Sequence, residues 1–105
     1  MGDLDAATAQ FEKGIDRNPK AAELHYLLGK ALAYKNRPRE ARRSFQRAAA
    51  LSPFDAEFYY ELGAIDEREG NTESAIRSYE KAIKLNPQHV DAKRRIEFLR
   101  ARSMR

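Results

Sequence analysis

The chain repeats itself with a fixed period of 34 residues. Pro19, Pro53 and Pro87 stand 34 positions apart, with no insertion or deletion between them. The same offset relates three further sets of side chains: Ala7, Ala41 and Ala75, then Phe11, Phe45 and Tyr79, and then Gly14, Ala48 and Ala82. Similarity at a fixed period of this length is the signature of a repeat architecture, in which each unit buries its apolar face against its neighbours. We therefore expect a stack of similar units.

Each unit reads as helical. Leu24, Leu28, Ala31 and Leu32 illustrate the apolar spacing of three and four residues that is typical of an α-helix, and no segment reads as a strand. Gly2, Asn36 and Gly70 stand 34 residues apart, and both residue types tolerate the left-handed conformation that closes a helix. Asp55 suits an N-cap and Pro38 a first helical turn. We predict six helices, over residues 3–17, 21–35, 38–51, 55–69, 72–85 and 89–103.

Gly29 and Gly63 lie in the middle of predicted helices and need an explanation. Gly29 and Gly63 each cost about 1 kcal/mol of helix propensity relative to alanine. Each follows a leucine on the apolar face, where a missing side chain would let a partner helix approach closely. On the second helix of each pair we expect Ala41 and Ala75 as the small partners, and Phe45 and Tyr79 as the large side chains that lock one pair to the next.

This combination resembles the tetratricopeptide repeat, in which an aromatic-x-x-Leu-Gly helix precedes a helix with Ala, an aromatic residue, Ala and a final Pro. The resemblance lies in HYLLGKAL with EARRSFQRAAALSP, and in YYELGAID with ESAIRSYEKAIKLNP. It covers nearly the whole chain. The resemblance implies an all-α fold, a right-handed α-solenoid built from antiparallel helix pairs.

The resemblance also implies a domain organisation. We expect one repeat domain over residues 1–105, with a half repeat (2–19), two repeats (22–55 and 56–89) and a capping helix (90–105). In the last helix Glu97 takes the glycine position and Arg100 follows, so we expect a polar outer face that closes the stack. Leu4, Phe11 and Ile15 lack the helix that would normally precede them. Either the chain is cut from a longer array, or copies associate through this flank.

In this family the first helix of each pair lines the concave surface, so the resemblance implies which side chains face a partner. Tyr and Arg often dominate the energetics of such interfaces. We expect a groove that binds a peptide or partner domain carrying some acidic groups, although tyrosines on amphipathic helices can also be partly buried spacers. The candidate groove residues are Tyr26, Lys30, Tyr34, Tyr60, Arg68, Arg94, Phe98 and Arg102, with Glu23, Glu57 and Asp91 along one edge.

The best-known specialised groove of the family clamps the C-terminal carboxylate of chaperones with lysines and asparagines. The matching positions of this chain hold Tyr26, Lys30, Glu61, Asp91 and Arg95. Of these, only Lys30 and Arg95 could bind a carboxylate, whereas Glu61 and Asp91 would repel it. We therefore do not expect this activity.

The sequence offers little for catalysis. It has two histidines, no cysteine and no Gly-rich phosphate loop, so we predict no enzyme activity, no metal and no cofactor. His25 falls in a core position and His89 beside a helix start, where packing and capping explain them. The carboxylates of residues 57–69 lack histidine neighbours, so we interpret them as a solvated face. No apolar run approaches the roughly 20 residues of a membrane span, and the first residues lack the pattern of a secretory signal. We expect a soluble, cytoplasmic chain.

The positive charge is concentrated at the end of the sequence. Of the 20 Lys and Arg residues, six lie between Lys93 and Arg105, against one of the 16 acidic residues, so the remainder is nearly neutral. The alternative function is therefore electrostatic binding of nucleic acid or anionic membrane through this helix. An ordinary capping helix kept soluble by its charge is the interpretation that we favour, and we do not expect nucleic acid or membranes as partners. The basic residues concerned are Lys93, Arg94, Arg95, Arg100, Arg102 and Arg105.

Overall fold

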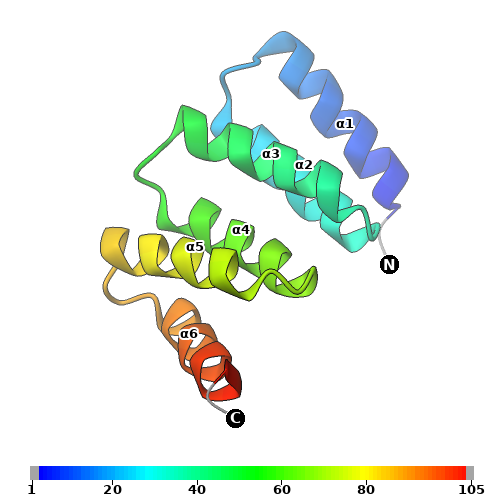
Figure 1. Ribbon diagram of the computed structural model, residues 1–105. Helices are drawn as coiled ribbons and strands as arrows, with labels where there is room; N and C mark the ends of the chain where they lie inside the picture. Colours follow the sequence, from blue (N-terminus) through cyan, green and yellow to red (C-terminus); the bar gives the residue numbers. More distant parts are fainter. Residues whose placement is uncertain (1–2, 104–105) are drawn as a thin grey trace. The chain divides into compact units, whose positions relative to one another are not determined.

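The computed structural model describes residues 3–103, which form six α-helices and no strand (Figure 1). The predicted bounds agree with the observed ones to within one residue at each end. The chain consists of two compact units, Met1–Pro53 and Phe54–Arg105, which we call unit 1 and unit 2. Unit 1 contains α1 (Leu4–Arg17), α2 (Ala22–Tyr34) and α3 (Pro38–Leu51), and unit 2 contains α4 (Ala56–Arg68), α5 (Thr72–Leu85) and α6 (Val90–Ser103).

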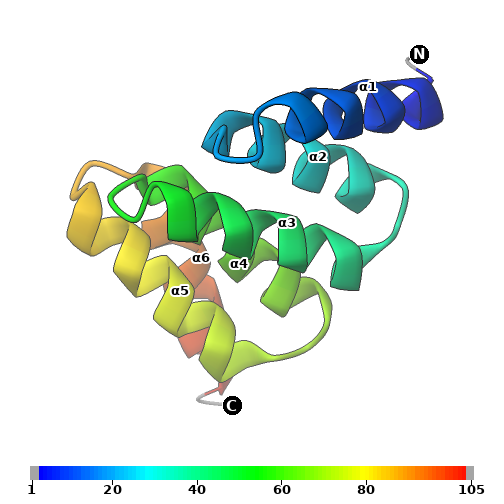
Figure 2. The same ribbon diagram turned by 90° about the horizontal axis from the view of Figure 1, so that it is seen from above.

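The same turn joins the two helices of each complete pair. Asn36 has φ 62° and Gly70 has φ 81°, as predicted for the residues that close α2 and α4, whereas Gly2 lies outside the described residues. In both turns the next residue donates its backbone N–H to a carbonyl in the last turn of the helix. Arg37 donates to the Leu32 carbonyl (2.9 Å), and Asn71 donates to the Asp66 carbonyl (2.8 Å). The chain therefore reverses tightly, and Figure 2 shows α2 and α3, and likewise α4 and α5, running antiparallel.

Aspartate side chains cap the starts of two helices. The Asp3 carboxylate accepts the N–H groups of Asp5 (3.0 Å) and Ala6 (3.1 Å) at the start of α1. The Asp55 carboxylate accepts the N–H of Glu57 (3.0 Å) at the start of α4, so the predicted N-cap is confirmed. Pro38 is the first residue of α3, also as predicted. A helix start leaves several backbone N–H groups without partners inside the helix. The two aspartates accept some of these groups, and proline has no N–H group to be satisfied.

Each mid-helix glycine faces an aromatic ring of the second helix in its own pair. A Cβ atom built on Gly29 would lie 2.6 Å from a ring carbon of Phe45, and one built on Gly63 would lie 2.7 Å from ring carbons of Tyr79. Both rings are buried, at 1% exposure. The expectation of close approach is confirmed, but the nearest neighbours are the rings rather than the alanines that we expected.

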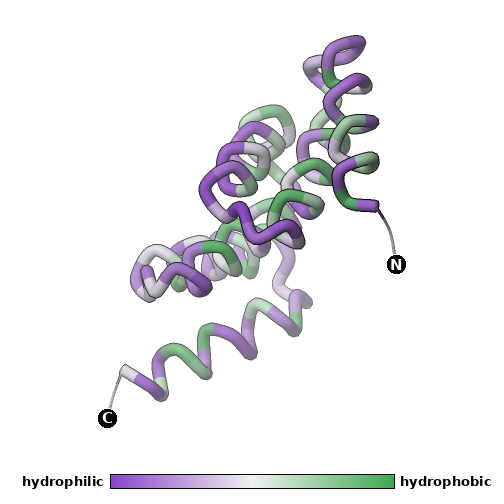
Figure 3. The backbone as a smooth tube through the Cα atoms, turned by 90° about the vertical axis from the view of Figure 1, so that its right-hand side faces the viewer, coloured by the Kyte–Doolittle hydropathy of each residue, from purple (hydrophilic) through white to green (hydrophobic). Residues whose placement is uncertain are grey.

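One cluster of buried side chains in the core of unit 2 joins α5 to α6. It consists of Ala75, Tyr79 and Ala82 of α5 with Ala92, Ile96 and Leu99 of α6. Figure 3 shows hydrophobic and hydrophilic stretches alternating along α6, which ends near the C-terminus. In unit 1, α1 packs against α2, and its Leu4, Phe11 and Ile15 side chains are half-buried. The apolar flank of α1 is thus only partly covered in the described part of the chain.

Candidate functional site

The candidate residues of unit 1 lie on α2 and differ in exposure. Tyr26 and Lys30 are half-buried, whereas Tyr34 is 75% exposed. The Tyr26 ring lies 6.1 Å from the Phe45 ring, and the Lys30 ammonium lies 5.4 Å from the Tyr26 ring. Tyr26 is therefore both a packing residue and a surface residue, and Tyr34 is the freely presented aromatic side chain of this helix.

In unit 2, two side-chain links connect α4 and α6. His89 Nε2 lies 3.0 Å from Glu57 Oε1. The Arg95 guanidinium donates through Nε to Glu67 Oε1 (3.0 Å) and through Nη2 to Glu67 Oε2. We call the surface along these links the α4–α6 face. It comprises Glu57, Tyr60, Glu61 and Glu67 of α4, with His89, Asp91, Arg95, Phe98 and Arg102 from α6 and the residue before it.

His89 is held from three sides. Its Nδ1 accepts the N–H of Ala92 (3.2 Å) at the start of α6, so that nitrogen carries no proton in this arrangement. Nε2 is then the nitrogen that donates to Glu57. The imidazole centroid also lies 4.7 Å from that of the Tyr60 ring. His89 thus caps α6 as predicted, and it fixes the position of Tyr60 as well.

Tyr60 stands in negative surroundings. Burial is the main cause that raises the pKa of its hydroxyl, and the charges of Asp91, Glu61 and Glu57 raise this pKa further. Arg95 acts in the opposite direction. The formal net charge of the chain is +4, so the local charge around Tyr60 is opposite in sign to the overall charge.

Glu67 and Arg95 form a supported pair. The Tyr79 hydroxyl donates to Glu67 Oε1 (2.8 Å) from the core side, and burial raises the pKa of this hydroxyl, which keeps it protonated. The Arg95 guanidinium carbon lies 4.6 Å from the centroid of the Phe98 ring, and that of Arg102 lies 5.5 Å from it. Phe98 is therefore an exposed aromatic ring (45%) flanked by two arginines.

The interpretation of the α4 carboxylates as a solvated face was wrong for two of them. Asp66 is buried (7% exposed) and accepts the hydroxyl of Ser74 (2.7 Å). Glu67 is 19% exposed at its side chain and holds Arg95. Both carboxylates join elements of unit 2 instead of facing water. Glu67 and Arg95 are 28 positions apart, and their opposite charge was the only signal in the sequence for this pair.

The basic residues of α6 are not all available to a ligand. Arg95 is paired with Glu67, and Arg100 donates to Glu80 of α5 (2.6 Å). Lys93 and Arg94 are exposed, and Arg102 lies beside Phe98. Arg105 lies outside the described residues. Two of the cations that an electrostatic partner would need are therefore matched by carboxylates of the same unit.

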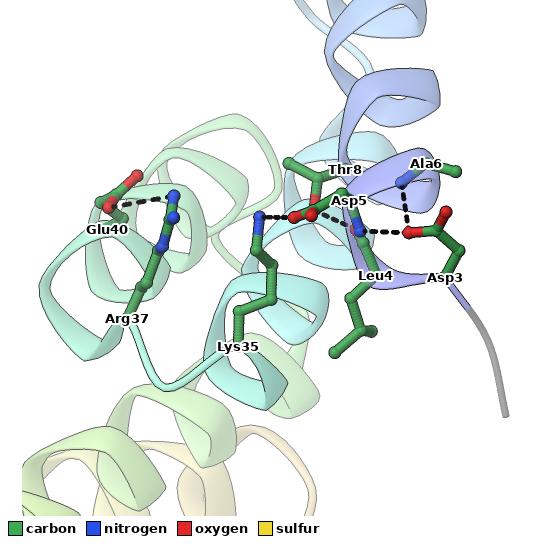
Figure 4. A network of polar contacts seen from close by, with 8 residues as sticks. All are labelled: Asp3, Leu4, Asp5, Ala6, Thr8, Lys35, Arg37 and Glu40. Carbon is green, nitrogen blue, oxygen red and sulfur yellow. Dashed lines mark hydrogen bonds and ion pairs between the residues drawn. The ribbon is translucent and has the colours of Figure 1, made fainter.

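Each unit has a cleft of its own. In unit 1 a cleft of about 370 Å³ is lined by all three helices, and two pairs of opposite charge lie among its lining residues (Figure 4). Lys35 contacts Asp5 at 2.5 Å, and Arg37 lies 3.9 Å from Glu40. The Lys35 ammonium, by hydrogen bond and by charge, holds the pKa of Asp5 below its usual value. In unit 2 a cleft of about 340 Å³ lies between α5 and α6, lined by Glu80, Ile83, Lys93, Ile96, Glu97 and Arg100.

Two other kinds of site are absent from the described residues. Within residues 3–103, no group of three or more His, Cys, Asp or Glu side chains is placed to hold a metal ion. None of the helices over the same residues combines the length and the apolar character needed to cross a membrane. The α4–α6 face and the α2 surface are therefore the candidate sites that we pursue.

Comparison with known proteins places this geometry among helical repeats. A MamA protein has a TM-score of 0.88 and 31% identity, over 93% of this chain and 54% of that one. The first TPR of Spaghetti (RPAP3), bound to an HSP90 peptide, has a TM-score of 0.92 and 22% identity, over 97% and 81%. The O-GlcNAc transferase of Thermobaculum terrenum has a TM-score of 0.85 and 26% identity, over 93% and 19%. The chain thus spans about half the length of the MamA protein that it matches.

A family model decides the assignment. None of the curated proteins compared with the chain matches it. The predicted fold class, an all-α solenoid of helical repeats, is confirmed by the structural relatives, and this fold is a scaffold for protein interaction. The model of the tetratricopeptide repeat matches residues 1–35 and 26–90, so the chain belongs to the tetratricopeptide repeat family.

Proposed function

We propose that the chain binds a peptide segment or a partner domain on the surfaces of its first helices, α2 in unit 1 and α4 with α6 in unit 2. The observation that carries the proposal is the exposure of large aromatic side chains there, Tyr34 at 75% and Phe98 at 45%. Aromatic rings beside arginines are the groups that most often dominate binding energy. We also propose that the repeats form one domain, closed by α6.

Preorganisation supports this proposal. Tyr60 is held between His89 and the Tyr79 ring, at centroid distances of 4.7 and 5.6 Å, and Phe98 lies under Arg95 and Arg102. Side chains that are already fixed lose less conformational entropy when a ligand arrives. The face therefore needs little reordering to bind.

The experiment removes the exposed rings and leaves the packed ones in place. Peptides would be selected from a displayed random library on the wild-type chain, and their affinity measured for the double variant Tyr34→Ser/Phe98→Ser. Tyr26 and Tyr60 are unsuitable because they pack against Phe45 and Tyr79. Phe54→Ser is the matched control, since Phe54 is 84% exposed in the turn before α4. We expect the double variant to lose at least about 2 kcal/mol of binding energy, the size of a hot-spot contribution.

Equal binding to the double variant and the wild type would place the binding surface elsewhere and refute the proposal. Loss of binding in the Phe54→Ser control instead would assign the aromatic contact to the turn. Circular dichroism of all variants checks that the helices are retained, which the exposure of the substituted side chains leads us to expect.

A further inference from the structure

Arg95, whose charge acts on Tyr60 within the α4–α6 face, already has a carboxylate partner. Arg95 directs one edge of its planar guanidinium group, Nε and Nη2, at the two oxygens of Glu67. A two-point contact of this kind is the strong form of an arginine–carboxylate bond. An acidic ligand would have to share Arg95 with Glu67 or displace it.

Displacement of Glu67 is unfavourable because its side chain is only 19% exposed. Its other contact is the Tyr79 hydroxyl (2.8 Å), which belongs to the core of unit 2. Separation from Arg95 would leave a largely buried carboxylate with a single neutral donor, and removing one partner of such a pair is costly. Glu67 therefore withholds Arg95 from ligands.

With Arg95 matched, the other charges that act on Tyr60 are carboxylates, those of Glu57, Glu61 and Asp91. Glu57 and Asp91 lie at the start of α4 and α6, and Glu57 is 44% exposed at its side chain. A Lys or Arg side chain of a partner would meet here an aromatic ring and opposite charge together.

We propose that Glu67 determines the ligand preference of the α4–α6 face by holding Arg95, so that the segment bound there presents basic side chains to Tyr60. This inference rests on the proposed function. It reverses, for this end of the face, the expectation that the partner carries acidic groups. The overall charge of +4 would favour acidic ligands, so local and overall charge make opposite predictions.

The test uses two labelled peptides that differ only in carrying Lys or Glu at alternate positions of a Gly-Ser background. Fluorescence anisotropy at low salt would measure their affinity for the wild type and for Glu67→Gln, which keeps the acceptor for Tyr79 but releases the charge of Arg95. We expect the wild type to bind the Lys peptide more tightly, and Glu67→Gln to shift the preference toward the Glu peptide by about ten-fold, equivalent to about 1.4 kcal/mol.

Two further variants keep the test interpretable. Asp91 is exposed, so Asp91→Asn leaves the fold intact and should weaken binding of the Lys peptide by about two- to five-fold. Glu12→Gln removes one exposed carboxylate from α1 and should leave both affinities unchanged. This control separates an effect of the face from an effect of net charge.

A wild type that prefers the Glu peptide, or a preference that neither Glu67→Gln nor Asp91→Asn alters, overturns the inference and leaves the proposed function standing. If neither peptide binds, and library peptides do not distinguish Tyr34→Ser/Phe98→Ser from the wild type, the proposed function fails together with it. The two failures are therefore distinct.

Discussion

Gly63 is the position where one added methyl group tests the packing of a helix pair. The structure allows no room for that group, because a Cβ atom there would lie 2.7 Å from Cδ1 and Cε1 of Tyr79. The ring cannot easily move away, since it is 1% exposed and its hydroxyl is bonded to Glu67. Gly63→Ala should therefore strain the contact between α4 and α5.

Two opposing contributions set the size of the effect. Alanine gains about 1 kcal/mol of helix propensity over glycine in a helix interior. Overpacking of a well-filled core costs about 1–3 kcal/mol, and the fixed ring favours the upper part of this range. We expect Gly63→Ala to lower the free energy of unfolding by about 1–2 kcal/mol, and Tm to fall by about 4–8 °C for each kcal/mol in a domain of this size.

Gly14 provides the matched control in a helix of unit 1. A Cβ atom there would meet Cδ1 of Leu24 at 3.0 Å, which is the far end of a flexible side chain. Gly14→Ala should therefore gain helix propensity at little packing cost and raise the free energy of unfolding, by up to about 1 kcal/mol. Urea denaturation followed by circular dichroism measures both variants. If Gly63→Ala stabilised the chain as much as Gly14→Ala does, the argument that the Tyr79 ring requires glycine would be refuted.

Further predictions concern single contacts and partners. By NMR titration, the pKa of the Asp5 carboxyl should lie below its usual value of 3.8, and it should return to that value in Lys35→Met. Because the pKa is lowered in the folded state, the contribution of Asp5 to stability is present at pH values above the usual pKa. This contribution is lost as the pH falls through the folded-state pKa. His89→Ala removes the cap of α6 and the bond to Glu57, and should cost about 1–2 kcal/mol in urea denaturation, whereas an unchanged midpoint would show that neither bond stabilises the fold. RNA, DNA and anionic vesicles should not bind even at low salt, and salt-sensitive binding would revive the electrostatic alternative. Light scattering should show self-association that a charged residue in place of Phe11 abolishes; a strict monomer would contradict association through α1.

The helices could be predicted because their signals are local and recur. The 34-residue period, the turn residues Asn36 and Gly70, and the cap Asp55 all act within a few positions of the chain. The need for glycine at positions 29 and 63 could also be predicted, since a helix interior rarely holds glycine without a packing reason. The side chains that pack against these glycines could not be predicted, because the spacing of residues within one helix does not say which side chain of the next helix lies opposite.

The contacts of the α4–α6 face depend on the offset between two helices that are not consecutive. Glu67 and Arg95 are 28 positions apart, which is not the repeat period, so inspection of matching columns does not connect them. The same holds for Glu57 and His89, which are 32 positions apart. Composition therefore suggested an arginine-rich groove, whereas the pairing of side chains decides which of those arginines a ligand can reach.

A binding face of this kind can differ from its composition in the ligand that it accepts. Arg95 and Arg100 both neutralise carboxylates of unit 2, so neither contributes its full charge to a partner. Near Tyr60, Asp91 is exposed and its charge acts on the hydroxyl in the same direction as that of Glu57, whose carboxylate is bonded to His89. Since a charge already satisfied within the protein attracts a ligand less than an equal charge that is not, the preference of the face follows from its internal pairs. Substitution of Glu67 should then change the ligand preference more than substitution of a residue that acts on the ligand only through its charge at a distance.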